Sequence, residues 1–256
     1  MLFSRILSFI TPLISAGFVI LAHFWPSNFY YFAIIVLLLN VLTIWRFFKT
    51  SGHIKHHSIF FAANRIFALL FGFFGAAILV ENFPAIFIGA VLLGIFLWLF
   101  YGDLFFYLFR DFNDEAVNKK IFRFNVLEIA AIFGFAIILM GLQDFLSYSL
   151  WWFCFSALIF FYWADFSRFF AVGSISKKEV LLKALIPALI LMEIMLTVWI
   201  LPPVYYVKAA LFTLFYAIFA SFNYGADEIL TTARRKFYLI IGIAGAILLL
   251  ITARWF

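Results

Sequence analysis

The chain has 256 residues, of which 68% are hydrophobic and only 12% are charged, and its formal net charge is +6. A soluble domain is about half apolar and a quarter charged, so this composition excludes a water-soluble fold. The basic residues lie in short segments between apolar runs, which is typical of membrane orientation and argues against nucleic acid as a partner. Membrane lipids are the partner that the composition predicts.

Nine apolar runs follow one another along the chain. A run of about 17 to 25 residues is long enough to cross roughly 30 Å of hydrocarbon as an α-helix. We therefore expect an all-α, polytopic integral membrane protein with about nine transmembrane helices, forming a single transmembrane domain over residues 1–256. The expected spans are 6–24, 29–48, 58–80, 84–109, 121–142, 147–172, 180–201, 204–223 and 237–253.

The connections between the expected spans alternate in charge. Odd-numbered turns are short and nearly uncharged, as in Trp25-Pro26-Ser27-Asn28 and Pro202-Pro203. The amino-terminal end, the even-numbered turns and their flanks hold all the basic residues except Arg65, Lys208 and Arg254, which is 18 − 3 = 15 of them. Since basic loops stay on the cytoplasmic side, we expect a protein of the cell (cytoplasmic) membrane with its amino terminus in the cytoplasm and its carboxyl terminus outside.

Three acidic residues recur at a constant spacing. Asp103, Asp165 and Asp227 are 62 residues apart, because 165 − 103 and 227 − 165 both equal 62. Each closes the second helix of an expected hairpin, which predicts four hairpins as parallel repeats and a final helix. The approximate bounds are 1–50, 51–112, 113–174, 175–236 and 237–256. The alternative is that helix pairs of membrane-fixed length give such a period without a repeat.

Ionisable residues inside the expected spans form the candidate site. Arg65 and Glu128 each lie about seven residues from the cytoplasmic end of a span, about 10 Å deep, and Asp103 reaches a similar depth. We expect a polar layer that faces the cytoplasm and contacts a solute or ion, with Asn64, Asn125 and Asp165 as further candidates. The alternative is a cluster that only locks helices together, for which a guanidinium and carboxylates are well suited.

Glu193 is a separate candidate for ion or proton binding, near the middle of the seventh expected span. Lys208 on the next span either reaches toward Glu193 or extends to the nearby membrane surface.

One segment, His53-Ile54-Lys55-His56-His57, resembles a histidine box of the membrane desaturases and hydroxylases. Those enzymes hold two irons with histidines from several boxes, whereas this chain has 4 His in all. We therefore interpret the segment as a solvated basic loop, and we predict no metal and no cofactor.

A second segment, Asp111 to Lys120, resembles the aspartate-rich loop of the UbiA-type prenyltransferases. The resemblance implies a cytoplasmic loop whose carboxylates bind magnesium and prenyl diphosphate. A solvated loop without that function is the competing interpretation.

Three classes of function remain. Repeated hairpins and buried charge favour a transporter- or channel-like protein for a small solute or ion. Short loops also fit a non-catalytic subunit or scaffold that packs against partner membrane subunits. An intramembrane lipid- or prenyl-modifying enzyme is the third and least favoured class, because no phosphate-binding glycine loop, HExxH or CxxC motif occurs in the sequence and no catalytic residue stands out.

Overall fold

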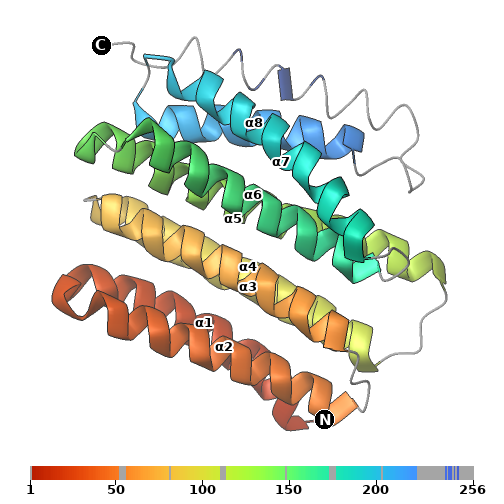
Figure 1. Cartoon of the computed structure of the whole chain (residues 1–256). Coiled ribbons are helices and arrows are strands. Elements are labelled where there is room, and N and C mark those ends of the chain that lie inside the picture. The colour runs from red at the N-terminus through yellow and green to blue at the C-terminus, as the bar shows by residue number, and fades with distance from the viewer. Residues whose placement is uncertain are drawn as a thin grey trace. The chain divides into compact units, whose positions relative to one another are not determined.

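The computed structural model describes residues 2–51, 56–80, 82–109, 114–147, 149–172, 177–202 and 204–223, with residues 240, 242, 243, 245 and 247 of the last expected span. Within these residues the chain is helical and no strand occurs, so the all-α prediction is confirmed (Figure 1). The helices are α1 (Leu2–Phe24), α2 (Phe29–Ser51), α3 (His56–Leu79), α4 (Phe83–Phe109), α5 (Asp114–Leu146), α6 (Leu150–Val172), α7 (Lys177–Trp199) and α8 (Tyr205–Asn223), and a short 3-10 helix, η1 (Pro26–Asn28), links the first two.

Six of the described helices are long and apolar enough to cross a membrane, namely α1 to α5 and α7. In α6 and α8 the described apolar stretches are shorter, Leu150–Phe166 and Tyr205–Ala220. Most of the ninth expected span lies outside the described residues. The chain is therefore a helical membrane protein, while the count of nine spans stays a prediction.

Helix α5 differs most from its expected bounds. It begins at Asp114, seven residues before the apolar run, because Glu, Ala and Lys favour helix and acidic residues suit a helix amino terminus. It also continues through Gln143 and Asp144, which the sequence placed in a turn. The helix ends at Leu146, and Ser147 follows with a φ of 48°, a left-handed conformation typical of a helix end.

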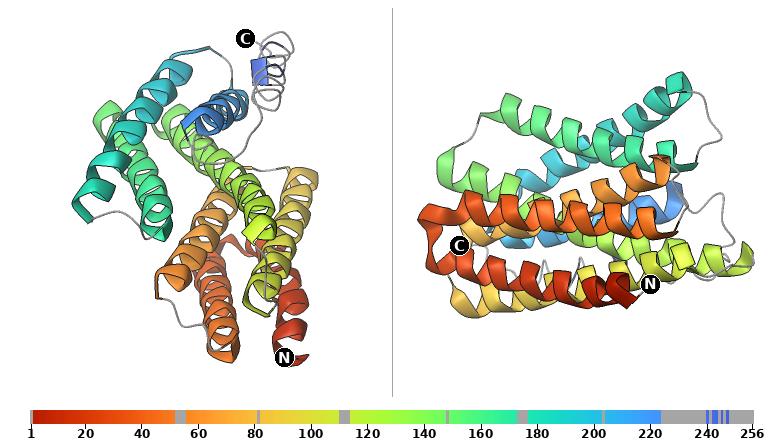
Figure 2. Two further views of the ribbon diagram at one scale, coloured as in Figure 1. Left: turned by 90° about the vertical axis from the view of Figure 1, so that its right-hand side faces the viewer. Right: turned by 90° about the horizontal axis from the view of Figure 1, so that it is seen from below.

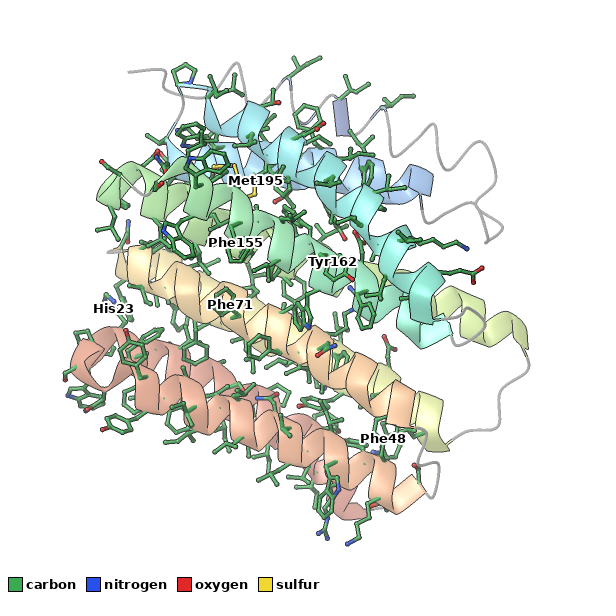
Figure 3. All side chains as sticks on the ribbon, in the orientation of Figure 1. His23, Phe48, Phe71, Phe155, Tyr162 and Met195 are labelled. Carbon is green, nitrogen blue, oxygen red and sulfur yellow. The ribbon has the colours of Figure 1, made fainter. Side chains whose placement is uncertain are left out.

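The chain divides into two compact units, residues Met1–Phe135 and Ala136–Phe256. In the first unit α1 packs along both α2 and α4, and α3 also packs along α2 and α4, so the four helices form a closed ring (Figure 2). Rings of His23 and Phe24 at the end of α1 lie 5.9 and 5.4 Å from that of Phe83 at the start of α4. His23 and Phe48 mark the two opposite ends of the α1–α2 hairpin (Figure 3).

In the second unit α7 packs along both α6 and α8. Phe153 of α6 contacts Trp199 of α7 with ring centroids 5.8 Å apart, and Phe161 of α6 contacts Phe212 of α8 at 5.4 Å. Phe153, Phe161 and Phe212 are buried and form part of the core of the unit, with Trp199 half-buried beside them.

Large aromatic side chains are exposed where α1 joins α2, where α5 joins α6 and where α7 joins α8. Trp and Tyr collect at membrane–water interfaces because one end of the ring system is apolar and the other is polar. The three uncharged turns therefore carry the residues expected of an interface. The exposed residues are Trp25, Tyr30, Tyr31, Trp151, Trp152 and Tyr206.

Candidate functional site

An ion pair between Arg65 of α3 and Glu128 of α5 forms the centre of the candidate site. The two residues are only 8% and 4% exposed. An Nη of Arg65 donates to a carboxylate oxygen of Glu128. The expectation that Arg65 pairs with a carboxylate at its own depth is thus confirmed, since an unpaired charge there is costly.

Two glycines bring α3 and α5 together beside this ion pair. Gly72 lies seven residues after Arg65, and Gly134 lies six residues after Glu128. A Cβ built on Gly134 would come within 2.6 Å of the Gly72 backbone, so Gly134 has no room for a side chain, and a Cβ on Gly72 would lie a tight 3.0 Å from the Ala131 carbonyl oxygen. Arg65 precedes Gly72 on α3, and their partners Glu128 and Gly134 follow the same order on α5. The two helices therefore run parallel. The backbones approach closely, as glycine contacts allow in membranes.

The two aspartates of the candidate set are both buried. Asp103 of α4 is 4% exposed and lies in the first unit, whereas Asp165 of α6 is 1% exposed and lies in the second. Both interact with other residues. Their convergence on one polar layer with Arg65 stays a prediction, and Asp227 lies outside the described residues.

The two candidate asparagines differ in what the structure describes. Asn64 is half-buried next to Arg65, and its Nδ2 atom is buried without a hydrogen-bond partner among the described residues. A buried donor without a partner is costly, so a water or a ligand that reached it would stabilise it. The side chain of Asn125 lies outside the described ones.

Glu193 is exposed on α7, so within the described part of the chain its side chain is not packed against the helices that neighbour α7. Its carbonyl oxygen accepts a hydrogen bond of 2.9 Å from the Thr197 hydroxyl. Lys208 does not reach it. That lysine is buried and instead donates to Asp144 at 3.2 Å, so the expectation that it reaches toward Glu193 was wrong.

A second polar cluster, which the sequence did not reveal, joins α1, α2 and α4. Asn40 is central: its Nδ2 donates to Ser15 Oγ at 3.0 Å and to the Val36 carbonyl at 2.7 Å, and its Oδ1 accepts from Tyr101 at 2.7 Å. The hydroxyls of Thr11 and Thr43 lie 3.0 Å apart, and Ser15 donates to the Thr11 carbonyl. A possible signal was the placement of polar residues one turn apart, at 11 and 15 and at 40 and 43.

The Asn40 cluster is fully buried, and its amide uses both N–H donors and one acceptor position of Oδ1. Networks of this kind fix the rotation and register of neighbouring helices, because each group would be left unpaired in another register. We assign the cluster to the assembly of the first unit rather than to ligand binding.

The two enzyme-like segments lie partly outside the described residues. His56 and His57 open α3, and residues 52–55 are outside the description. Asp114 to Lys120 form the first turns of α5 and not a loop, which departs from the resemblance to prenyltransferases. Among the described residues no group of three or more His, Cys, Asp or Glu is placed to hold a metal ion.

Comparison of the chain with protein-family models, with curated proteins and with solved structures finds no match.

Proposed function

We propose that this chain is a multi-pass transporter- or channel-like protein whose polar layer, centred on Arg65 and Glu128, meets a small ion in the cytoplasmic half of the membrane. The observation that carries the proposal is the burial of both charged groups within helices that are apolar enough to span a bilayer. Ionisable residues at membrane depth usually line ion paths or proton relays. Their insertion is costly, so they are retained mainly where they serve a function.

The chemistry of the pair favours an anion that moves with a proton. A guanidinium has five N–H donors in a planar fork, so Arg65 is suited to hold a small anion in place of the Glu128 carboxylate. The released carboxylate then takes a proton, which keeps the site neutral while the anion is bound. In a low-dielectric site this neutrality favours binding of the anion together with a proton, since each uncompensated charge costs several kcal/mol.

The wider architecture that we propose has nine spans, with the amino terminus in the cytoplasm and hairpins repeated about every 62 residues. The parallel contact of Gly72 with Gly134 supports the repeat, because these residues are also 62 apart and each lies between two Phe residues, at 71 and 73 and at 133 and 135. Transporters are often built from such repeats, with the polar site at the repeat interface.

A non-catalytic scaffold subunit is the second candidate. The glycine contact one to two turns from the ion pair favours it, because close backbone packing and a buried ion pair together are what a lock between two helices requires. Transport requires the positive charge at residue 65 and the negative charge at residue 128, whereas a lock between two helices works with the charges exchanged.

A charge exchange tests the proposal. The purified chain and the variant Arg65→Glu with Glu128→Arg are reconstituted in vesicles loaded with a pH-sensitive dye, and inward gradients of chloride, nitrate or phosphate are applied. We expect anion-dependent acidification with the unchanged chain and a loss of at least tenfold with the exchanged variant, which keeps the ion pair and therefore folds. Equal flux from both variants, or no anion-dependent proton movement with the unchanged chain, would support the scaffold instead.

A further inference from the structure

A second ion pair, which is partly exposed, joins the end of α5 to the start of α8 in the second unit. Lys208, in the first turn of α8, donates to Asp144 Oδ1 in the last turn of α5 at 3.2 Å. The lysine side chain is 9% exposed, whereas the aspartate side chain is 31% exposed. The lysine side chain is thus mostly enclosed but keeps a small exposed part, whereas the aspartate side chain is more open.

Both partners have hydrogen-bonding capacity left over. An ammonium has three N–H donors and a carboxylate about four acceptor positions. Within the described residues, the bond between Lys208 and Asp144 is the one hydrogen bond that either side chain makes. A desolvated ammonium with a single acceptor is costly, so a further anionic or acceptor group beside Lys208 would stabilise it.

The surroundings of this pair are those of a membrane interface. Phe145 and Leu146, which follow Asp144, are 62% and 67% exposed. The Phe145 ring contacts that of Tyr205 at 5.4 Å, and the neighbouring Tyr206 is exposed. Aromatic side chains of this kind sit at the level of lipid headgroups, where both charge and apolar surface are present.

We propose that Lys208 and Asp144 bind the headgroup of a zwitterionic phospholipid of the phosphoethanolamine class. The phosphate accepts hydrogen bonds from the Lys208 ammonium, and the headgroup ammonium donates to the Asp144 carboxylate, while the acyl chains lie along exposed Phe145 and Leu146. The four charges then alternate in sign, so each group has opposite neighbours. A headgroup with a net negative charge lacks the cation that faces Asp144, and it is therefore disfavoured.

This inference is tested by lipid competition on the purified chain in detergent. Equal amounts of phosphatidylethanolamine, phosphatidylcholine and phosphatidylglycerol are added, and the lipids that stay bound are counted by native mass spectrometry. We expect phosphatidylethanolamine to exceed phosphatidylglycerol by about tenfold, the effect of one charge-assisted hydrogen bond. Equal retention of the three lipids by the unchanged chain would overturn the proposal without any variant.

Two variants and one control sharpen the test. Asp144→Asn keeps an acceptor for Lys208 but removes the carboxylate charge, so we expect the preference to shift toward phosphatidylglycerol. Lys208→Met should weaken retention of both phosphatidylethanolamine and phosphatidylglycerol. Lys183→Ala removes an exposed lysine on a different helix, α7, and should leave the preference unchanged. An unaltered preference in folded Asp144→Asn would reject the site. Displacement by soluble phosphoethanolamine at equal concentration would show that a solute, and not a lipid, is the ligand.

Discussion

Gly134 of α5 lies so close to Gly72 of α3 that a Cβ at Gly134 would come within 2.6 Å of the Gly72 backbone. Backbone atoms cannot move aside as the tip of a side chain does, so any larger residue separates the two helices. The contact therefore sets the distance between α3 and α5 and, with it, the geometry of the neighbouring Arg65–Glu128 pair.

The first prediction concerns Gly134→Ala. An added methyl group in a tight contact should destabilise the fold by about 1–3 kcal/mol, which exceeds the gain of about 1 kcal/mol that alanine brings to a helix. Thermal unfolding in detergent measures this effect. Gly102→Ala is the matched control, because a Cβ at Gly102 meets nothing within 4 Å and should be tolerated or stabilising. Equal melting temperatures for the two variants would contradict the contact.

The second prediction concerns the ion pair. Arg65→Ala leaves the Glu128 carboxylate buried without this partner, which costs about 3–5 kcal/mol for a broken buried pair. Arg65→Met together with Glu128→Leu removes both charges and should cost less. Unfolding of both variants in the same detergent gives the comparison. If the single variant is as stable as the double one, the pair does not bear on the fold.

The third prediction concerns Tyr101→Phe. The change removes the donor to Asn40 Oδ1 and leaves that acceptor unpaired in a buried site. Interhelical hydrogen bonds in membranes contribute about 0.6 kcal/mol on average, so a loss of about 0.5–1.5 kcal/mol is expected. Tyr30→Phe, on a side chain that is 76% exposed, should have no measurable effect. A loss of stability that is the same for both would refute the role of the network.

The fourth prediction separates transport from scaffolding at Asp103. If Asp103 belongs to the ion path, Asp103→Asn should abolish anion-dependent flux in vesicles while melting and elution stay close to those of the unchanged chain. Glu179→Gln, on an exposed residue near the start of α7, serves as the control and should retain flux. A loss of folding or assembly in Asp103→Asn, rather than of flux, would favour the scaffold.

The fifth prediction concerns orientation. In a variant with Cys154→Ala, a cysteine at Ser174 should react with an impermeant reagent only from the cytoplasmic side, and one at Ser27 only from outside. The expectation rests on the 15 basic residues assigned to one side, from 18 − 3 in the sequence. Reaction of both positions from the same side would overturn the count of spans between them.

The sequence predicted how deep a residue lies in the membrane better than it predicted which side of its helix the residue occupies. The length of an apolar run fixes how far a residue lies from the helix end, so the sequence predicted that Arg65 pairs with Glu128 or Asp103, and the pair with Glu128 is observed. Rotation about the helix axis needs a polar face to define it. Apart from Thr197, the residues within one turn of Glu193 are apolar, so the sequence has too little of a polar face there to indicate that this carboxyl is exposed on α7.

The Asn40 cluster illustrates the same limit. A single asparagine in an apolar run gives its own depth but not its partners, so nothing in the sequence identified Tyr101 as the donor to Asn40. The pairing of Lys208 with Asp144 was missed for a different reason. The apolar run ended at residue 142, whereas the helix continues through Leu146 and carries Asp144 with it.

The ring of α1 to α4 has a consequence for biosynthesis. Helix α1 packs along α4, whose last residue is made 109 − 24 = 85 residues after the end of α1. At about 5–20 residues per second, roughly 4 to 17 s pass before the ring can close. During this interval the Ser15 and Thr11 hydroxyls of α1 already have partners on α2, through Asn40 and Thr43. The hairpin of the first two helices is thus able to wait in the membrane with its polar groups paired, until Tyr101 arrives to complete the cluster.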